Sequence, residues 1–417
     1  MNSRERIYAA VRHQPVDRLA IDFGGTRQSG ISAFAYDRLR RRLALPGHDV
    51  ERPFRVFDTY QMLAEVEQRI ADRFGNDCIA LNRKRVAFGV ANERWKSWRP
   101  RPDVEEAFEV LVPGGFEPVR SESGGWVLKR DGEVIAEMPA GGFYFDRYEP
   151  YPGATHPDLD TWEAPRLSAA DIDHYGRTAE TLFEQTDKAI VMPLGPPYEL
   201  FNGIGQGGFE RWMMTFASEP DYVDALYTKL VDAWIENLKA VHDAVGERVQ
   251  VLQIADDFGM QSGPFLSEAM FRERLLPAYR RGLAWVHQHT TWRVLLHSDG
   301  AIRPLIPAII EMGVDILNPV QTSAPGMEPK GLKRDFGDRL AFWGGACDPQ
   351  STLSRGTPER VASEVAANVN TLAPGSGYVF APVHNIQADV PADNIVALFD
   401  TALRRAAAHA SPRTAPS

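Results

Sequence analysis

Residues 293–318 read RVLLHSDGAIRPLIPAIIEMGVDILN, in which two apolar runs flank a segment with helical spacing. The first run, 293–296, has the length and composition of a buried strand and ends at a polar break that contains a glycine. The segment 301–312 has the apolar periodicity of a helix, and 314–317 is the second apolar run. A strand, a helix and a strand in this order predict a β-α-β unit with parallel strands.

The same alternation of apolar runs and helical segments continues on both sides of this unit. Helical spacing occurs at 209–245, 267–289, 301–312, 328–336, 358–372 and 391–408. With two runs near the N-terminus included, the strand candidates are 19–23, 55–57, 189–194, 249–255, 293–296, 314–317, 340–343 and 377–381. Eight parallel strands close a (β/α)8 (TIM) barrel, so an α/β fold of this class is predicted.

A doubly wound open sheet is the main alternative, because alternation of strands and helices does not by itself establish closure. No G-x-G-x-x-G motif follows an early strand, as it would in a dinucleotide-binding sheet. Polar residues also follow strands all along the chain rather than at one switch point. Both observations favour the barrel.

Residues 82–146 differ from the rest of the chain, with aromatics, glycines and short alternating runs. The Asp131-Gly132 pair between two such runs is typical of a tight hairpin. We expect a small antiparallel β insertion in a single domain of residues 1–417, with a disordered tail at 411–417. Aromatic side chains of the insertion are expected to line or cover the pocket or to form a dimer contact; they are Trp95, Trp98, Phe108, Phe116 and Trp126.

Composition excludes several classes of protein. The 46 Lys and Arg are outnumbered by 56 Asp and Glu, with a net charge of -10, so no basic face for nucleic acid is expected. Two cysteines, Cys78 and Cys347, are too few for a disulfide framework or an all-thiolate metal site. No uninterrupted run of about 18 apolar residues occurs, and the charged N-terminus is followed by no apolar leader segment. We expect a soluble, cytoplasmic protein without a membrane or nucleic-acid partner.

Seven of the eight strand candidates have a polar or reactive residue at or after their carboxyl end. These residues are Asp22, Asp58, Asp256 with Asp257, His297 with Asp299, Asn318, Asp348, and His384 with Asn385. The carboxyl ends of barrel strands meet on one face, where TIM-barrel active sites are built. The pattern therefore predicts one shared catalytic pocket.

His297 and Asp299 lie two residues apart at a strand exit, and His384 arrives from a later strand. Imidazole nitrogen and carboxylate oxygen suit zinc, and also iron or manganese. In the simpler interpretation, His297 bonds locally and Asp299 caps the next helix. Cys347 near the same face is a candidate fourth ligand or a small buried residue.

Asp256 and Asp257 end one strand candidate, so one carboxylate is expected to point into the barrel mouth and the other toward the loop. Such a pair, and Asp58 likewise, can position a proton or hold a cationic group. Capping of helices and contacts within loops are the alternative roles.

Seven motifs taken together resemble the uroporphyrinogen decarboxylase superfamily. They are SRER (3–6) with Asp17-Arg18, DFGGT (22–26), IADDFG (254–259) with Gln261, HSDG (297–300), DILNPVQ (315–321), GTPE (356–359) and FAPVHNIQ (380–387). The similarity is greatest to the branch near the methylcobalamin:coenzyme M methyltransferases. It implies a (β/α)8 barrel and covers most of the chain outside the insertion and the tail.

In the methyltransferases of this superfamily, a His-x-Cys motif and a later Cys hold zinc. The resemblance places His297 at the first ligand, Asp299 where the first Cys would be, and His384 at the later Cys. In the decarboxylase branch, Asp58 and His384 match functional residues. Arg27 represents one of two substrate-binding arginines and Ile31 stands where the second would fall, which argues against a highly carboxylated tetrapyrrole.

These observations lead to a predicted metal-dependent methyl (one-carbon) transferase or demethylase that acts on a small molecule. The predicted metal, most simply zinc, is bound by His297, Asp299 and His384, and a corrinoid, a corrinoid protein or tetrahydrofolate is the methyl partner. The predicted catalytic residues are Asp58, Asp256, Asp257 and His384. The predicted substrate-binding residues are Asp22, Arg27, Tyr198, Gln261, Asn318 and Gln321. A metal-free decarboxylase or lyase and a non-catalytic binding barrel are the alternatives, and a homodimer is the candidate assembly.

Overall fold

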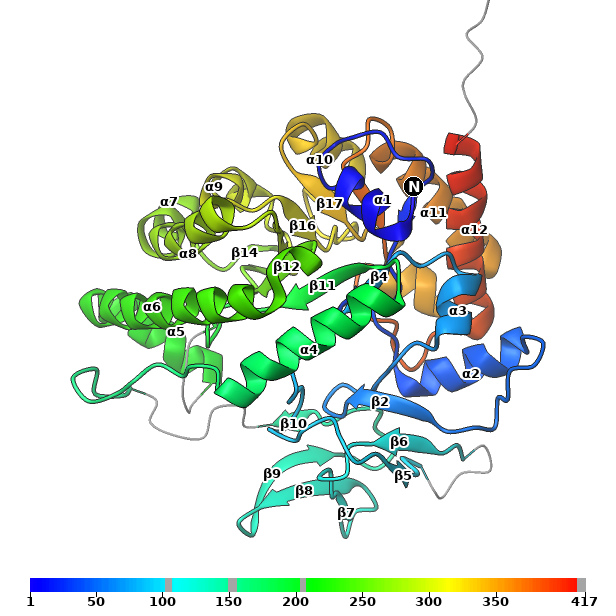
Figure 1. Cartoon of the computed structure of the whole chain (residues 1–417), viewed down its shortest axis with the longest axis horizontal. Helices are drawn as coiled ribbons and strands as arrows, with labels where there is room; N and C mark the ends of the chain where they lie inside the picture. The colour runs from blue at the N-terminus through cyan, green and yellow to red at the C-terminus, as the bar shows by residue number, and fades with distance from the viewer. Residues whose placement is uncertain (102–106, 149–155, 203–207, 411–417) are drawn as a thin grey trace, which may run out of the picture.

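The computed structural model describes residues 1–101, 107–148, 156–202 and 208–410. The tail predicted at 411–417 lies outside the described residues. Figure 1 shows a larger body of strands and helices in its upper part and small sheets below it. Among the described residues, no helix is long and apolar enough to cross a membrane.

The larger body is built on an eight-stranded sheet in the order β1-β18-β17-β16-β15-β12-β11-β4. All its strand pairs are parallel. The strands are β1 (Ala20–Ile21), β4 (Cys78–Ala80), β11 (Ala189–Pro193), β12 (Val251–Ala255), β15 (Arg293–His297), β16 (Ile316–Asn318), β17 (Ala341–Trp343) and β18 (Tyr378–Phe380). The predicted barrel class is confirmed.

The seam between β1 and β4 is closed by hydrogen bonds to residues just before β4. The Asp77 backbone N–H donates to the Ile21 carbonyl at 2.7 Å, and the Ile21 N–H donates to Asp77 Oδ2 at 3.0 Å. The Phe23 N–H donates to Asn76 Oδ1 at 2.9 Å. Side chains thus take the place of part of a strand ladder, and the barrel is nearly closed.

One of the predicted barrel strands is wrong. Residues 55–57 belong to β2 (Phe54–Asp58), which pairs with β3 (Leu63–Ala64) and β6 (Val110–Val112) outside the barrel. The second barrel strand is instead β4. A short helix, α3 (Gln68–Arg73), precedes β4.

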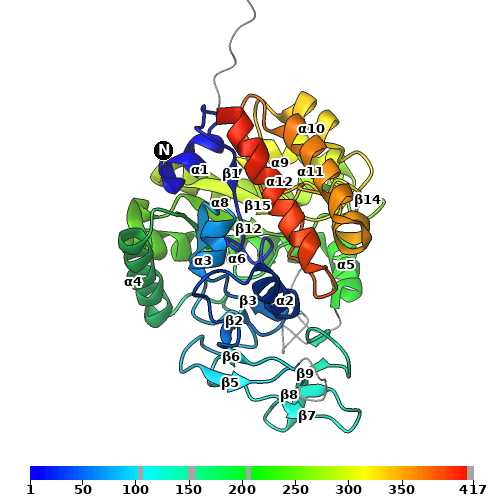
Figure 2. The ribbon, with the colours of Figure 1, turned by 90° about the vertical axis from the view of Figure 1, so that its right-hand side faces the viewer.

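Helices cover the outside of the barrel on all sides seen in Figures 1 and 2. The longer ones are α2 (Ala33–Leu43), α4 (Ala169–Gln185), α5 (Gly208–Ser218), α6 (Pro220–Val245), α8 (Leu276–His289), α11 (Pro358–Leu372) and α12 (Ala392–Ala410). The shorter ones are α1 (Ser3–Ala10), α7 (Glu268–Met270), α9 (Ile306–Met312) and α10 (Pro329–Phe336), with single turns at 246–248, 271–275, 303–305 and 349–353. The start of α11 is capped by Thr357, whose side chain accepts from the Arg360 N–H.

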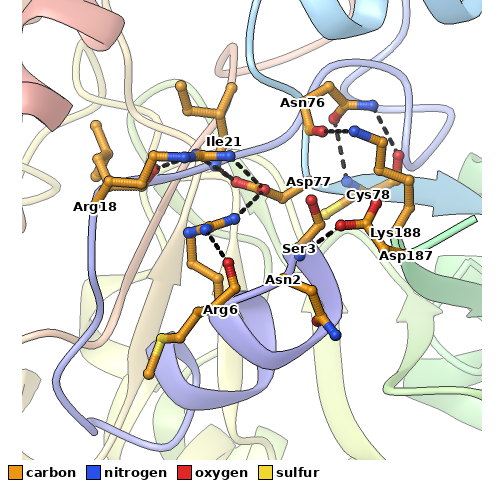
Figure 3. Close-up of polar contacts among 12 residues, drawn as sticks. Asn2, Ser3, Arg6, Arg18, Ile21, Asn76, Asp77, Cys78, Asp187 and Lys188 are labelled. Atoms are coloured by element: carbon orange, nitrogen blue, oxygen red, sulfur yellow. Dashed lines mark hydrogen bonds and ion pairs between the residues drawn. The ribbon is translucent and has the colours of Figure 1, made fainter.

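Helix α1 closes the amino-terminal end of the barrel. Its Ile7 and Ala10 pack in one buried cluster with strand residues that face the barrel interior, among them Val251, Leu295 and Trp343. Arg6 of the same helix reaches the buried Asp77 carboxylate at 2.7 Å, and Arg18 binds it through two nitrogens at 2.8 Å (Figure 3). The amino-terminal end is therefore plugged, and the opposite face is free to hold a site.

The β-rich part of the chain forms two four-stranded sheets, β10-β9-β8-β7 and β3-β2-β6-β5. Their remaining strands are β5 (Lys96–Trp98), β7 (Val119–Arg120), β8 (Trp126–Arg130), β9 (Glu133–Met138) and β10 (Arg147–Tyr148). Strands β8 and β9 form the antiparallel hairpin expected at Asp131-Gly132. A further two-stranded ladder joins β13 (Gly259–Met260) and β14 (Gly263–Pro264).

The aromatic side chains of this part pack mainly with one another rather than in the barrel mouth. Trp98 packs edge-on to Phe116 and to Trp126, with ring centroids 5.4 and 5.2 Å apart. Phe108 packs against Phe34 of α2 at 5.4 Å. These contacts give the sheets a core and attach them to α2. Of the roles expected from the sequence, the dimer contact stays a prediction.

Candidate active site

The ends of β15 and β18 bring together the three residues predicted as metal ligands. His297 is the last residue of β15, and Asp299 follows it in the loop before α9. His384 lies four residues beyond the end of β18. One possible ligand atom from each residue lies within 4.8 Å of those of the other two.

Each histidine is oriented by an asparagine. Nδ1 of His297 lies 2.7 Å from Oδ1 of Asn318, and Nδ1 of His384 lies 3.1 Å from Oδ1 of Asn385. In a neutral ring, Nδ1–H that donates to an amide oxygen leaves the lone pair on Nε2. Supporting contacts of this kind fix the tautomer and ring orientation of metal-bound histidines.

The Asp299 carboxylate lies between the two rings. Its Oδ2 is 3.5 Å from Nε2 of His297 and 3.9 Å from Nε2 of His384. Ligands bound to one ion at about 2.0–2.2 Å are at most about 4.4 Å apart, so both separations already fit. Two imidazole nitrogens and one carboxylate oxygen form a donor set suited to zinc, and also to iron or manganese.

The protonation states of the three residues differ. Burial would lower the pKa of His297, but its contact with Asp299, the nearby charges of Asp299 and Asp257 and the bond to Asn318 raise it to about 9. Burial acts to raise the pKa of Asp299, and its contacts with His297 lower it below the usual value overall. Burial lowers the pKa of His384. A metal ion at His297 therefore has to displace a proton.

The adjacent acids at the end of β12 have different surroundings. Asp256 is buried, and its Oδ2 accepts from the Phe201 N–H at 2.6 Å and from the Tyr279 hydroxyl at 2.7 Å. Burial, followed by the charge of Glu199, raises its pKa well above the usual value. These contacts make Asp256 a link between the loop after β11 and α8.

Asp257 is the acid that faces the histidine pair. Its Oδ1 accepts from the Asp299 N–H at 2.9 Å, and its charge helps to raise the pKa of His297. Of the two acids, Asp257 is thus the one that contacts the loop of Asp299 and whose charge acts on His297.

Asp58 does not reach the mouth from a barrel strand. It ends β2, is fully buried and forms an ion pair with Arg27, whose Nη2 lies 2.5 Å from its Oδ2. Its Oδ1 accepts from the Tyr60 and Gln61 N–H groups at 2.9 and 3.1 Å. The side chain of Gln61 accepts in turn from Asn385 Nδ2 at 2.6 Å, so this loop supports the residue that orients His384.

Asp22 lies at the end of β1, completely buried. Its Oδ2 accepts from Nε1 of Trp343 at 2.8 Å, and its Oδ1 accepts from the Gly25 N–H at 2.8 Å. Burial is the main cause that raises its pKa, from 3.8 to about 6. These contacts join β1 to β17 across the interior, and no contact with the histidine pair is seen among the described residues.

The predicted substrate-binding glutamines lie beside Asp299 and His384, two of the predicted metal ligands. Oε1 of Gln321 accepts from the Gly300 N–H at 2.7 Å, and its Nε2 donates to Oε1 of Gln261 at 3.1 Å. Both line a cavity of about 750 Å³ that Asp299 and His384 also line. Asn318 contacts His297 and is absent from the described lining of that cavity.

The loop after β11 contributes one acid that the sequence analysis did not select. Glu199 follows the half-buried Tyr198; its Oε2 accepts from Nδ2 of Asn202 at 2.6 Å, and burial raises its pKa. The charges of Asp257 and His297 act on it, which places it near the ligands. In the sequence, its position directly after Tyr198, a predicted substrate-binding residue, was the one feature that could have identified Glu199.

The candidate fourth ligand Cys347 is buried in the hydrophobic core, and burial raises the pKa of its thiol.

Comparisons with known proteins place this chain among relatives of known family and fold. A uroporphyrinogen decarboxylase of Pseudoalteromonas translucida is 28% identical over 247 residues, which are 56% of this chain and 65% of that protein. A uroporphyrinogen decarboxylase of Neisseria gonorrhoeae is 26% identical over 216 residues, 50% of this chain and 56% of that protein. The chain thus spans less than two thirds of the length of these curated relatives.

A solved structure described as a methyltransferase from Methanosarcina mazei superposes with a TM-score of 0.58 and 18% identity. It covers 97% of this chain and 99% of its own, so the likeness of fold extends through the insertion. The family described as uroporphyrinogen decarboxylase (URO-D) matches residues 157–405, more than half of the chain. The chain belongs to the uroporphyrinogen decarboxylase family.

Proposed function

We propose that this protein is a metal-dependent methyl (one-carbon) transferase or demethylase that acts on a small molecule. The observation that carries the proposal is the paired orientation of His297 and His384. Each donates Nδ1–H to an asparagine oxygen, and each directs Nε2 toward Asp299. This arrangement prepares two nitrogens and one oxygen for a single divalent cation, with zinc the first candidate.

A divalent ion bound there would supply Lewis acidity toward an oxygen or sulfur of the substrate. Proton transfer, orientation of the rings and substrate binding would be carried out by side chains of the protein. Asp257 holds the Asp299 backbone and is placed to take or return a proton at the mouth. Asn318 and Asn385 keep both rings in one tautomer, and Gln261 and Gln321 line the space where substrate would sit.

The methyl partner is proposed from family likeness. The resemblance to corrinoid-dependent methyltransferases and the fold shared with a protein described as a methyltransferase support a corrinoid, carried by a partner protein, or tetrahydrofolate. The small-molecule substrate would occupy the cavity, and the carrier would approach its open side.

A metal-free decarboxylase is the second candidate, because the curated relatives carry that name. In that mechanism Asp58 would stabilise a cationic intermediate and His384 would move protons. The pairing of Asp58 with Arg27 argues against it, since the carboxylate already has a cationic partner.

Activity under metal control separates the two functions. Methyl transfer or demethylation should be lost in chelator and restored by zinc, and His297→Ala should abolish it. His289→Ala is the matched control, because His289 is an exposed histidine of α8 stacked on Trp285. Decarboxylation that persists in chelator and is lost in Asp58→Asn would establish the second function instead.

A further inference from the structure

The amide of Asn385 is buried and is held from two sides by glutamine side chains. Its Oδ1 lies 3.1 Å from Nδ1 of His384 and also accepts from Nε2 of Gln387. Its Nδ2 donates to Oε1 of Gln61 at 2.6 Å. An amide has an acceptor at one end and donors at the other, so the direction of the Asn385 amide decides whether Nδ1 of His384 carries a proton.

A backbone carbonyl fixes the direction of this amide. Nε2 of Gln387 donates to the backbone carbonyl of Asn385 at 3.2 Å, and a carbonyl oxygen can only accept. The end of Gln387 that faces Asn385 is therefore its NH2 group, and the Asn385 atom beside that group has to be the oxygen. The NH2 group of Asn385 then faces Gln61, which supplies the acceptor. Exchanging the two ends of the Asn385 amide would set donor against donor at Gln387.

The two glutamines come from chain segments that backbone hydrogen bonds hold together. The Ile386 N–H donates to the Gly30 carbonyl at 2.9 Å, and the Ala64 N–H donates to the Ile31 carbonyl at 2.9 Å. Residues 30–31 thus join the segment after β18 to the loop between β2 and β3, which carries Gln61. The contact between Gln61 and the amide therefore depends on strand-like pairing rather than on a free side chain.

The direction of the amide has a consequence for the proposed metal ligand. In a neutral His384 ring, the Nδ1–H bond leaves the lone pair on Nε2, which lies 3.9 Å from Oδ2 of Asp299. We propose that Gln61 and Gln387 are positioning residues, which hold His384 in the Nδ1–H tautomer with Nε2 free to bind a cation. They act through the amide of Asn385. The consequence for metal binding rests on the proposed function, whereas the tautomer can be measured without a metal.

The tautomer of His384 in the metal-free protein tests this proposal. Long-range proton–nitrogen NMR spectra distinguish Nδ1–H from Nε2–H, and loss of the signals in His384→Gln assigns them. Burial lowers the pKa of His384, so the ring is neutral at about pH 8. The wild type should show the Nδ1–H form. The double variant Gln61→Leu, Gln387→Leu should shift the ratio of the tautomers about 10-fold toward Nε2–H, because the Asn385 amide can then turn its nitrogen toward Nδ1.

Two further variants separate this role from a general effect on structure. Gln61→Glu keeps an acceptor opposite Nδ2 of Asn385 and should retain the wild-type tautomer. Gln250→Leu is the matched control: Gln250 is buried at the amino-terminal end of β12, accepts from the Ile190 N–H at 2.9 Å and donates to the Arg248 carbonyl at 3.1 Å. It should leave the tautomer unchanged. An unchanged tautomer in the double variant, or an equal shift in Gln250→Leu, would overturn the proposal.

Zinc affinity, measured on the same proteins by competition with a chromophoric chelator, distinguishes this proposal from the proposed function. The double variant should bind zinc about 10-fold more weakly than the wild type, the effect usual for contacts that orient a ligand. A shifted tautomer in the double variant, together with a wild type that binds no zinc, would refute only the proposed function. Zinc binding by the wild type, together with an unchanged tautomer in the double variant, would refute only the role of the two glutamines.

Discussion

Asn318 provides a sensitive test of the proposed metal site, because it contacts the proposed ligand His297 but is not itself a proposed ligand. Its Oδ1 lies 2.7 Å from Nδ1 of His297, and its Nδ2 donates to the Trp343 carbonyl at 2.9 Å. Asn318→Leu keeps the approximate size of the side chain and removes both bonds. His297 then loses the acceptor that fixes its tautomer, and its ring is free to turn.

The expected cost is a 10- to 100-fold loss of metal affinity, roughly 1.4–2.7 kcal/mol, the usual range for removing such a supporting contact. Zinc affinity can be measured by competition with a chromophoric chelator. The fold should persist, because the other strand-end contacts around His297 remain.

Asn394→Leu is the matched control. Asn394 is equally buried, and its Nδ2 donates to the carbonyls of Leu353 and Gly356, both at 2.9 Å, but its side chain makes no contact with the histidine pair. It should lower the free energy of unfolding without changing zinc affinity. If Asn318→Leu also leaves zinc affinity within about 3-fold of the wild type, orientation of His297 by Asn318 is refuted.

Two further predictions concern stability. Burial raises the pKa of Asp22 from 3.8 to about 6, so folding takes up a proton between these values. This group therefore lowers the free energy of unfolding by about 2 kcal/mol as pH rises from 4 to 7. The difference between wild type and Asp22→Asn in urea denaturation should show that slope, and a difference independent of pH would contradict it. Asp77→Ala should cost about 3–5 kcal/mol in the same assay, since it leaves the buried Arg6 with one fewer carboxylate and opens the β1–β4 seam (Figure 3). Asp232→Ala, which removes the exposed partner of Arg281, should cost at most about 1 kcal/mol, and equal losses would refute the role given to Asp77.

The sequence was most informative where strands are flanked by long helices. The run 293–296 and the glycine after it predict β15, its exit and the loop of Asp299. β4 escaped prediction because Cys78–Ala80 is too short to show a period, and its seam is completed by the side chains of Asp77 and Asn76. The equally short run at 55–57 has two apolar residues, Val56 and Phe57, for a different reason: β2 buries them where it pairs with β3 and β6, outside the barrel.

The sequence predicted which strand ends form the candidate site, but it did not predict how the side chains at those ends point and pair. The alternation of side chains along a strand does not show how Asp256 and Asp257 are oriented. Hydrogen bonds from the loop after β11 and from Tyr279 fix the direction of Asp256. The pairing of Asp58 with Arg27 joins residues 31 apart in sequence, and no local pattern indicates it. Glu199 follows a strand by a loop without periodicity, so its place near the ligands depends on tertiary structure.

The central claim is that His297, Asp299 and His384 hold one divalent ion. Elemental analysis of the purified wild type, His297→Ala and His289→Ala proteins, each dialysed against the same zinc buffer, tests it directly. The account predicts about one zinc per chain in the wild type and in His289→Ala, and none in His297→Ala with the fold intact by circular dichroism. Equal zinc content in all three proteins, or none in the wild type, would contradict it.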